Sequence, residues 1–484
     1  LMLGERIVKN AAQYPERIAI CYGDQNYTYG ELIQDIQETS TIIQELTKNR
    51  LEPIGLLFSN SYAYFVAFLA CRICHKPAVL LSPAYKTNEL QYHIKQLRIR
   101  FLLTQSGRTP GLTEIKGTCV LSGQKQIDYW AFQLSYEPPL FEPDDSVCLM
   151  TSGTNGIPKA VVRKEAAVWS EVVAKSAALH LTRKDRVFIL PPVYHAYCHG
   201  TAFGALMTGA QIHLVKEFVP INALHYISKE SITILYAVPF MYNVFIEEMQ
   251  LRENIAYRDR FASIRAAFSG GAPISHRSAA LFQSLTGHFL SIDYGSTETG
   301  AVCIYWNPRE HSNAVGFPLD HVEIHVFDEK NNYQVPGVSG ELRVKCKAGK
   351  SRYLYPEELN QTAFYEDWYC TGDYGKVDET GLVFVAERLK NIINVSGHNV
   401  DPCEVENVLL KMPQIKEAAV VGAPCDILGE TVKAFIVVNE QITLDKIVKY
   451  CKGCLADYKV PRIIEFTDKI PKNELGKTLK RKMN

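Results

Sequence analysis

Apolar and polar positions follow two different periods along the first half of the chain. Short apolar runs of the kind found in buried strands alternate with longer stretches in which apolar residues recur at helical spacing. The strands predicted first are 54–58, 78–81 and 101–104, and the helices between them are 62–74 and 88–97. Regular alternation of strand and helix predicts a parallel, doubly wound sheet.

The same alternation resumes beyond residue 145. Predicted strands there are 187–190, 212–215, 234–238, 264–268 and 289–293, with helices such as 239–249 and 275–285. Nearer the start, Thr28-Tyr29-Gly30-Glu31 is a capping-box pattern and predicts a helix that begins beside it. Residues 105–145 mix polar and apolar positions and contain three prolines in 138–143, so we expect a connection there.

The pattern changes twice toward the C-terminal end. Residues 321–346 alternate with period two and carry turn signals, which predicts a β-rich subdomain at about 310–389. Beyond Lys390 a smaller α+β unit is predicted, with helices at 401–411 and 444–455 and strands at 418–421 and 434–438. We therefore expect an α/β protein with an N-terminal domain of residues 1–389 and a C-terminal domain of residues 390–484.

Composition narrows the class of protein. The formal net charge of the 484 residues is zero, so no basic surface favours nucleic acid as a partner. No run approaches the roughly 18 apolar residues that a transmembrane helix needs, and the first residues lack the apolar region of a signal peptide. We expect a soluble, cytoplasmic protein whose 13 cysteines are reduced core residues, including the pairs Cys71/Cys74 and Cys451/Cys454.

The most informative stretch follows an apolar run that ends at Met150. It is Thr151-Ser152-Gly153-Thr154-Asn155-Gly156-Ile157-Pro158-Lys159. Glycines let backbone N–H groups approach an anion, the hydroxyl groups are neutral donors, and the lysine adds a mobile positive charge. The combination suits a polyphosphate, although the spacing is not that of a Walker loop.

This stretch and six further segments resemble, in the same order, the motifs of the adenylate-forming enzymes. That family contains acyl-CoA synthetases, luciferases and the adenylation domains of peptide synthetases. The further segments are Pro192-Val193-Tyr194-His195, Ser269-Gly270-Gly271-Ala272-Pro273, Asp293-Tyr294-Gly295-Ser296-Thr297-Glu298, Gly340-Glu341-Leu342-Arg343-Val344, Tyr369-Cys370-Thr371-Gly372-Asp373, and Glu387-Arg388-Leu389-Lys390 together with Pro471-Lys472-Asn473-Glu474-Leu475-Gly476-Lys477.

The resemblance implies a site for ATP and Mg²⁺. Tyr294 is expected to stack on adenine, Thr297 to bind the α-phosphate, Glu298 to hold Mg²⁺ and Asp373 to accept hydrogen bonds from the ribose hydroxyls. Arg388 is expected to reach the nucleotide and Lys390 to be the hinge before a mobile C-terminal domain. The full set of expected ATP-binding residues is Thr151, Ser152, Gly153, Thr154, Asn155, Gly156, Lys159, Gly271, Ala272, Pro273, Asp293, Tyr294, Gly295, Ser296, Thr297, Asp373, Arg388 and Lys477.

The second substrate is expected to be an apolar carboxylic acid. By resemblance His195 borders the carboxylate pocket, with Tyr236, Met241 and Gly270 as further substrate contacts. The pocket is predicted from residues 195–204, 236–241 and 269–271, which are mostly aromatic or small and include no fixed cation. Amino-acid-activating relatives place an aspartate near this histidine to hold the substrate ammonium, but residues 186–216 contain no acid. A buried cation without a partner is costly, so an amino acid is disfavoured. Fatty acids and aryl acids both fit such a pocket, and of the two we expect a fatty acid.

The expected reaction is ATP-dependent formation of an acyl-adenylate followed by transfer to CoA. The catalytic residues implied are Lys477, His195, Thr297 and Glu298, with Lys477 bridging the carboxylate and the α-phosphate. Asn394 stands where many CoA-using relatives carry a lysine, and Asn155 replaces a usual threonine. Loading of an acyl carrier protein therefore remains an alternative to CoA, and a light-emitting oxidase and a nucleotide-binding protein without catalysis are remote alternatives.

Overall fold

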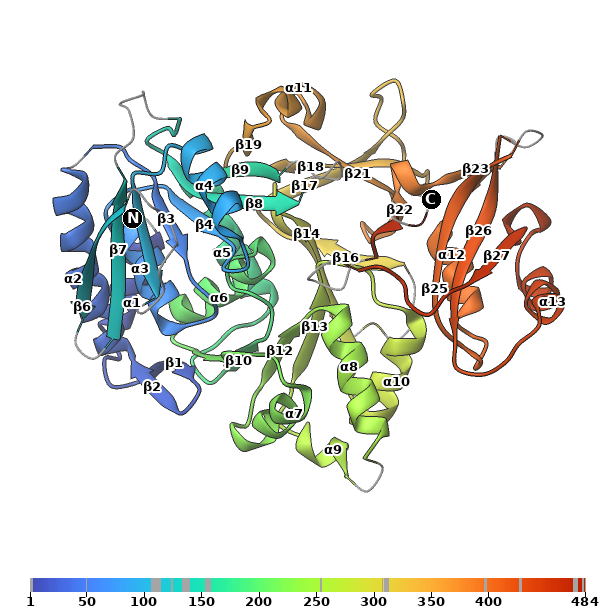
Figure 1. Cartoon of the computed structure of the whole chain (residues 1–484), viewed down its shortest axis with the longest axis horizontal. Coiled ribbons are helices and arrows are strands. Elements are labelled where there is room, and N and C mark those ends of the chain that lie inside the picture. The colour runs from blue at the N-terminus through green and yellow to red at the C-terminus, as the bar shows by residue number, and fades with distance from the viewer. Residues whose placement is uncertain are drawn as a thin grey trace.

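Two large sheets and a smaller C-terminal sheet make up the computed structural model (Figure 1). It describes residues 3–48, 50–105, 115–122, 125–132, 140–152, 158–252, 255–306, 308, 313–395, 398–425, 429–472, 478–480 and 483. Within these stretches no helix is both long and apolar enough to cross a membrane.

The first large sheet has a parallel centre with antiparallel edges. Its described strands lie in the order β19-β9-β8-β4-β3-β5-β7-β6. The parallel strands are β3 (Ile54–Leu57), β4 (Ala78–Leu81), β5 (Phe101–Gln105) and β8 (Asp145–Ser152). The antiparallel strands are β6 (Ile115–Ser122), β7 (Lys125–Phe132), β9 (Pro158–Lys164) and β19 (Arg352–Tyr355). Helices α3 (Tyr62–Ile73) and α4 (Thr87–Gln96) connect the parallel strands as predicted.

The prediction for residues 105–145 was wrong in part. Strands β6 and β7 form a hairpin there, and β7 pairs antiparallel with β5. Strand β7 lies between β5 and the edge strand β6, and its two faces pack against different apolar clusters, Ile127 and Tyr129 on one side and Trp130 on the other. Ile127 is 2% exposed, and Trp130 Nε1 donates to Thr104 Oγ1 at 3.2 Å.

The second large sheet joins a parallel half to an antiparallel half. Among the described residues it runs β17-β18-β21-β22-β16-β15-β14-β13-β12-β10-β11-β1-β2, with β20 paired to β21. The parallel strands are β1 (Ile18–Tyr22), β10 (Arg186–Ile189), β11 (Gln211–Leu214), β12 (Ile234–Ala237), β13 (Ala266–Gly270) and β14 (Leu290–Ser296). The others are β2 (Gln25–Thr28), β15 (Gly300–Tyr305), β16 (Ala314–Pro318), β17 (Val322–Phe327), β18 (Gly340–Cys346), β20 (Phe364–Tyr365), β21 (Trp368–Val377) and β22 (Val383–Arg388). The β-rich segment predicted near residue 321 is this antiparallel half.

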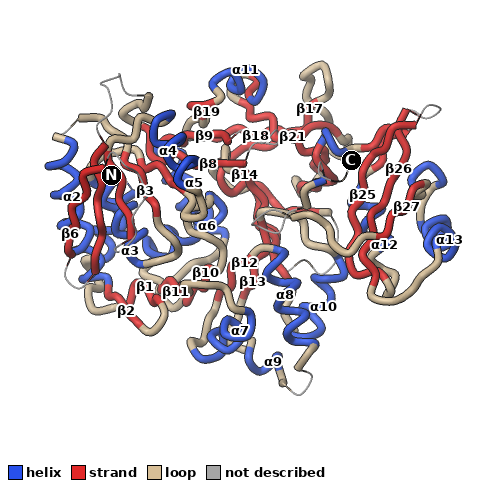
Figure 2. The backbone as a smooth tube through the Cα atoms, in the orientation of Figure 1, coloured by secondary structure: helices blue, strands red, loops and turns tan. Residues whose placement is uncertain are grey.

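Helices pack on the parallel strands, as Figure 2 shows. They are α1 (Leu3–Ala11), α2 (Tyr29–Thr47), α5 (Glu165–Ala178), α6 (Ala196–Thr208), α7 (Pro220–Lys229), α8 (Pro239–Gln250), α9 (Tyr257–Arg260) and α10 (His276–Thr286). The predicted capping box is present, because the Thr28 side chain accepts from the Glu31 backbone N–H while the Glu31 carboxylate accepts from the Thr28 N–H at 2.7 Å. These two bonds satisfy donors that a helix start otherwise leaves open.

The C-terminal unit is α+β, as the sequence predicted. It contains β23 (Ile393–Val395), β24 (His398–Val400), β25 (Ile415–Cys425), β26 (Gly429–Val438) and β27 (Ile463–Phe466) with α12 (Pro402–Leu409) and α13 (Leu444–Cys454). It docks on α10, where Arg277 Nη1 donates to the carbonyl oxygen of Ile415 at 2.7 Å. Lys416 and Glu247 form an exposed ion pair at 3.3 Å across the same junction.

Candidate functional site

The predicted phosphate-binding stretch lies on a hairpin between β8 and β9. The sequence placed Thr151, Ser152 and Lys159 in a loop, but the structure continues both strands into it and pairs Thr151 with Lys159 and Ser152 with Pro158. Pairing of the hairpin ends fixes where the loop begins and ends. Residues 153–157, which carry the predicted contacts of Gly153, Thr154, Asn155 and Gly156, lie outside the described residues.

Tyr353 connects this hairpin to the predicted metal ligand. It lies on β19 opposite Val161 of β9, and its hydroxyl donates to Glu298 Oε1 at 2.6 Å. The Nζ atom of Lys159 lies 5.5 Å from the centre of the same ring, within the range of a cation–π contact. Tyr353 and Glu298 are 3% and 8% exposed. A cation, an aromatic ring and a carboxylate that are far apart in sequence therefore form one cluster.

A buried ion pair between Arg163 and Glu171 holds the turn that carries Thr297 and Glu298. Arg163 Nη1 lies 2.7 Å from Glu171 Oε2, and both side chains are 1% exposed. Arg163 also donates to the carbonyl oxygen of Thr299 at 3.1 Å, and the N–H of Ala301 donates to Glu171 at 2.9 Å. Burial raises the pKa of Glu171, but the Arg163 and Lys175 cations and the hydrogen bond from the Ala301 N–H together leave the pKa below its usual value. The C-terminal side of the turn is thus tied to β9 and α5.

Two residues predicted to bind adenosine meet directly. The Tyr294 hydroxyl donates to Asp373 Oδ2 at 2.6 Å, although the two residues are 79 positions apart. Asp373 is opposite Arg388 in the pairing of β21 with β22, which brings a third predicted contact to the same place at backbone level. On the next strand Gly271 has φ +78° and opens the turn through Ala272 and Pro273 that leads from β13 to α10. This is the strand–glycine–helix junction that the sequence predicted.

His195 occupies the N-cap position of α6, at the end of the sheet where the parallel strands finish. Its ring lies 4.7 Å from the ring of Tyr194, and burial lowers the pKa of His195 to about 4. The imidazole is therefore neutral near pH 7. A neutral imidazole can donate to a carboxylate without adding charge, while the helix N-terminus behind it favours an anion.

A buried cation that the sequence did not single out lies beneath the predicted acid pocket. Lys175 of α5 lies with its Nζ atom 2.7 Å from Asp293 Oδ2, and the Tyr236 hydroxyl donates to the same carboxylate at 3.1 Å. Lys175 and Tyr236 are completely buried and Asp293 is 3% exposed. Burial raises the pKa of Asp293, and the Lys175 ammonium opposes that shift. The predicted pocket segments themselves contain no lysine or arginine, and the Lys175 cation beneath them is neutralised by Asp293.

Several residues that were predicted to contact ATP or the acid are buried and pack against other side chains. Asp293, predicted to bind ATP, is engaged by Lys175, and Tyr236 lies under the surface rather than on it. Met241 is 9% exposed and packs in the cluster of α7, α8 and α10. The partly exposed ring in front of them is Tyr197, which lay within the predicted pocket segment but was not singled out. Its aromatic side chain, two positions after His195, was the sequence signal that could have identified Tyr197 as a pocket residue.

The C-terminal residues expected to complete the site are described only in part. Residues 473–477, with Lys477, lie outside the described residues, as do the side chains of Arg388 and Lys390. The residues that flank this stretch are paired. Lys472 and Thr478 form an antiparallel β-bridge, and the N–H of Leu479 donates to the carbonyl oxygen of Pro471 at 2.8 Å. The predicted roles of Lys477, Arg388 and Lys390 therefore stay predictions.

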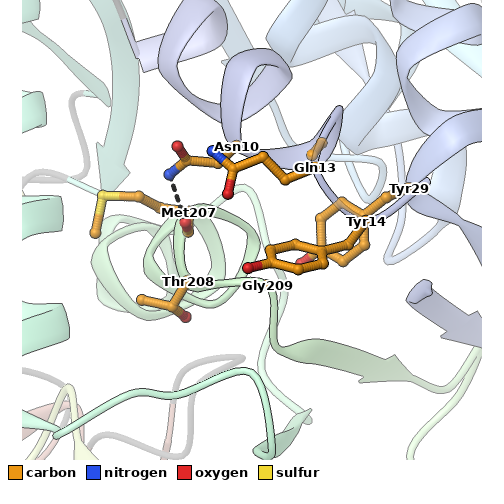
Figure 3. A pocket seen from close by; sticks show the side chains of 8 residues that line it. Asn10, Gln13, Tyr14, Tyr29, Met207, Thr208 and Gly209 are labelled. Carbon is orange, nitrogen blue, oxygen red and sulfur yellow. Dashed lines mark hydrogen bonds between the residues drawn. The ribbon is translucent and has the colours of Figure 1, made fainter. Parts of the chain in front are cut away.

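A shallow cavity of about 200 Å³ lies elsewhere, between α1 and the end of α6 (Figure 3). Asn10 Nδ2 donates to the carbonyl oxygen of Met207 at 2.8 Å, and the rings of Tyr14 and Tyr29 face Gly209. None of the predicted site residues lines it. The cavity therefore does not change the location of the candidate site at the ends of β8, β13 and β14.

Comparison with protein families gives two matches that together cover most of the chain. Residues 7–354 match the model described as AMP-binding enzyme, and residues 404–477 match the model of the AMP-binding enzyme C-terminal domain. A 2-succinylbenzoate–CoA ligase of Bacillus licheniformis is 29% identical over 97% of this chain and 97% of its own length. A long-chain-fatty-acid–CoA ligase of Escherichia coli is 30% identical, over 73% of this chain and 64% of that relative.

Solved structures resemble the whole chain. The o-succinylbenzoate CoA synthetase of Bacillus subtilis, in complex with its acyl-adenylate intermediate, has a TM-score of 0.82 and 26% identity over 99% of this chain and 97% of its own. The same enzyme with ATP and magnesium has a TM-score of 0.81 and 25% identity, over 98% of both chains. An anthranilate CoA ligase with bound anthranoyl-AMP has a TM-score of 0.83 at 23% identity and supports the fold alone.

Proposed function

This chain belongs to the family of AMP-binding enzymes, and we propose that it joins an apolar carboxylic acid to CoA through an acyl-adenylate. The observation that carries the proposal is the convergence of Lys159, Glu298 and the Tyr294–Asp373 pair at one edge of the two sheets. Ligands of α/β proteins bind beyond the carboxyl ends of parallel strands, which is where these side chains meet.

The first step is attack of the carboxylate on the α-phosphorus of ATP. Both reactants are anionic, so the site must neutralise charge and hold the groups in line. Lys159 and the β8–β9 hairpin bind the β- and γ-phosphates, and Thr297 binds the α-phosphate. Glu298 offers the hard carboxylate oxygen that Mg²⁺ prefers, and Mg²⁺ would screen the phosphate charge. Lys477 comes from the C-terminal domain and bridges the two reacting groups.

The nucleoside is bound on the other side of the turn. The Tyr294 ring offers a flat face to adenine, and Asp373 accepts from the ribose hydroxyls. The hydrogen bond between Tyr294 and Asp373 fixes the carboxylate before the nucleotide arrives, so little side-chain entropy is lost on binding. Pyrophosphate then leaves, and the acyl-adenylate is open to the CoA thiol.

We propose an aryl acid rather than a fatty acid as the physiological substrate. The sequence favoured a fatty acid, but two 2-succinylbenzoate–CoA ligases of Bacillus are 29% and 27% identical over 97% and 96% of their own length, whereas a long-chain-fatty-acid–CoA ligase of Bacillus subtilis that matches over 93% of its length is 23% identical. An amino acid stays disfavoured, because the acid nearest the pocket, Asp293, is already paired with Lys175. The half-buried aromatic residues Tyr194 and Tyr197 suit a flat ring.

The test is AMP formation from ATP with benzoates, succinylbenzoate and fatty acids, each with and without CoA, with the products identified by mass. CoA-dependent turnover with an aryl acid is the expected result. Accumulation of acyl-adenylate that CoA does not discharge would instead favour a carrier protein as acceptor, a possibility motivated by Asn394. Absence of AMP with every acid would refute the proposed reaction.

A further inference from the structure

The ring of Tyr197 is fixed across the carboxyl ends of two neighbouring strands. Tyr197 is the second residue of α6, and its hydroxyl lies 3.2 Å from the carbonyl oxygen of Ala237, at the end of β12. The carbonyl oxygen of Phe268 on β13 is also within reach, at 3.4 Å. The ring packs against the hydrophobic clusters on both sides of the sheet. It therefore spans the gap between α6 and the strands.

Gly270 provides the space that this ring occupies. A Cβ atom at position 270 would lie 2.3 Å from Tyr197 Cε2 and 2.5 Å from the carbonyl oxygen of Asp293, which no side chain can tolerate without a shift. Gly270 was predicted to contact the substrate, but the structure assigns the space beside it to the protein's own tyrosine. The edge of the Tyr197 ring therefore fills the space beside Gly270 and leaves no room for a ligand there.

The region behind Tyr197 is charged rather than apolar. Lys175 Nζ donates to the Tyr197 carbonyl oxygen at 3.1 Å and lies 5.5 Å from the Tyr197 ring centre. The same atom lies 2.7 Å from Asp293 and 5.2 Å from the Tyr236 ring. An alkyl chain pushed past Tyr197 would meet a buried ion pair whose separation is costly. Both the ring and the ion pair therefore disfavour a long apolar tail.

We infer that Tyr197 is the specificity-determining wall of the acid pocket and that, given the proposed function, it restricts the substrate to compact acids such as benzoates and short alkanoates. With the carboxylate beside His195, the remainder of the acid extends along the first turn of α6 and meets the Tyr197 ring. A single aromatic ring fits in front of this wall and can stack on it, whereas a long chain has no path.

The experiment compares kcat/KM for benzoate and for alkanoates from butanoate to hexadecanoate in the wild type, Y197F, Y197L and Y197A. The wild type should prefer benzoate and the short alkanoates. Y197A should raise the octanoate-to-benzoate ratio by at least tenfold, since one methylene of pocket space is worth roughly 10- to 200-fold in discrimination. Y197F keeps the ring and should keep the wild-type order of acids. Hexadecanoate should stay poor in every variant, because Lys175 and Asp293 remain.

The outcomes separate this inference from the proposed function. AMP formation by the wild type that is fastest with hexadecanoate would overturn the wall while leaving the ligase reaction in place. An unchanged octanoate-to-benzoate ratio in both Y197A and Y197L, with AMP still formed, would also overturn it. The smaller change Y197L guards against loss of folding in Y197A. Only a wild type that forms no AMP with any acid would count against the proposed function itself.

Discussion

Replacing Tyr353 by phenylalanine removes one hydroxyl group between the phosphate hairpin and the predicted metal ligand. The ring stays, so its contact with Lys159 at 5.5 Å is kept, whereas the 2.6 Å hydrogen bond to Glu298 is lost. The hydroxyl holds Glu298 Oε1 and so fixes the orientation of the carboxylate. Without it Glu298 can rotate, and we expect Mg²⁺ to be bound more weakly.

The size of the effect follows from burial. Tyr353 and Glu298 are 3% and 8% exposed, so water cannot readily replace the lost donor. A hydrogen bond to a charged group contributes about 1.5–3 kcal/mol. Since about 1.4 kcal/mol corresponds to a tenfold change in an equilibrium constant, we expect kcat/KM for MgATP to fall by roughly 10- to 100-fold. The apparent KM for Mg²⁺ should rise by a similar factor.

The assay is pyrophosphate release at saturating acid, with total Mg²⁺ titrated at fixed ATP. Tyr355→Phe is the matched control, because it removes a hydroxyl from the same strand whose partner is His93 and not Glu298. Thermal unfolding of both variants reports any general loss of stability. If Y353F lowers activity without moving the Mg²⁺ dependence, or if Y355F moves it equally, the positioning role of Tyr353 is refuted.

Three further predictions test other parts of the site and the fold. Lys477→Ala should lower acyl-adenylate formation by roughly 100-fold or more while supplied acyl-adenylate still reacts with CoA, and equal loss in the two half-reactions would contradict its role. Asp373→Ala should raise the KM for ATP by roughly tenfold, and Tyr294→Phe, which keeps the ring, by less; isothermal titration with ATP checks both. Burial lowers the pKa of His213 from 6.5 to about 3, so the unfolded chain binds a proton that the folded chain does not, and stability falls as the pH drops from 6.5 toward 3. His213→Gln should flatten this slope by about 1.4 kcal/mol per pH unit in urea unfolding, whereas the exposed His225→Gln should leave it unchanged.

The sequence predicted most of the parallel strands because each is a short apolar run, and burial on both faces requires that pattern, but it missed β1. Strand β4 begins and ends where it was expected, and the predicted helix 62–74 is one residue longer than α3. Strands β6 and β7 were missed, since residues 115–132 mix polar and apolar positions. The extension of β14 to Ser296 was missed because its pairing partner, β15, was not foreseen.

The sequence predicted the site residues whose role follows from their type within a single motif. It did not predict the contacts between residues of different motifs. The pairing of Tyr294 with Asp373 joins two motifs that were each identified, so only the contact was new. Tyr353 lies in no motif, and its hydroxyl reaches Glu298 from a strand 55 positions later. Lys175 lies in the last turn of α5, where a lysine ordinarily faces solvent, and only the fold brings it to Asp293.

The buried pair of Arg163 and Glu171 limits how this chain can be recombined with its relatives. Arg163 holds the carbonyl oxygen of Thr299, and Glu171 accepts from the N–H of Ala301, so residues from three successive segments depend on each other. A chimera with a crossover between positions 163 and 171 could inherit one buried charge without its partner, and such a loss costs about 3–5 kcal/mol. Crossovers before Arg163 or after Glu171 avoid that loss, because the contacts at Thr299 and Ala301 are made by the backbone and do not depend on which residue stands there. For gene shuffling, the segment from Arg163 to Glu171 is therefore a single heritable block.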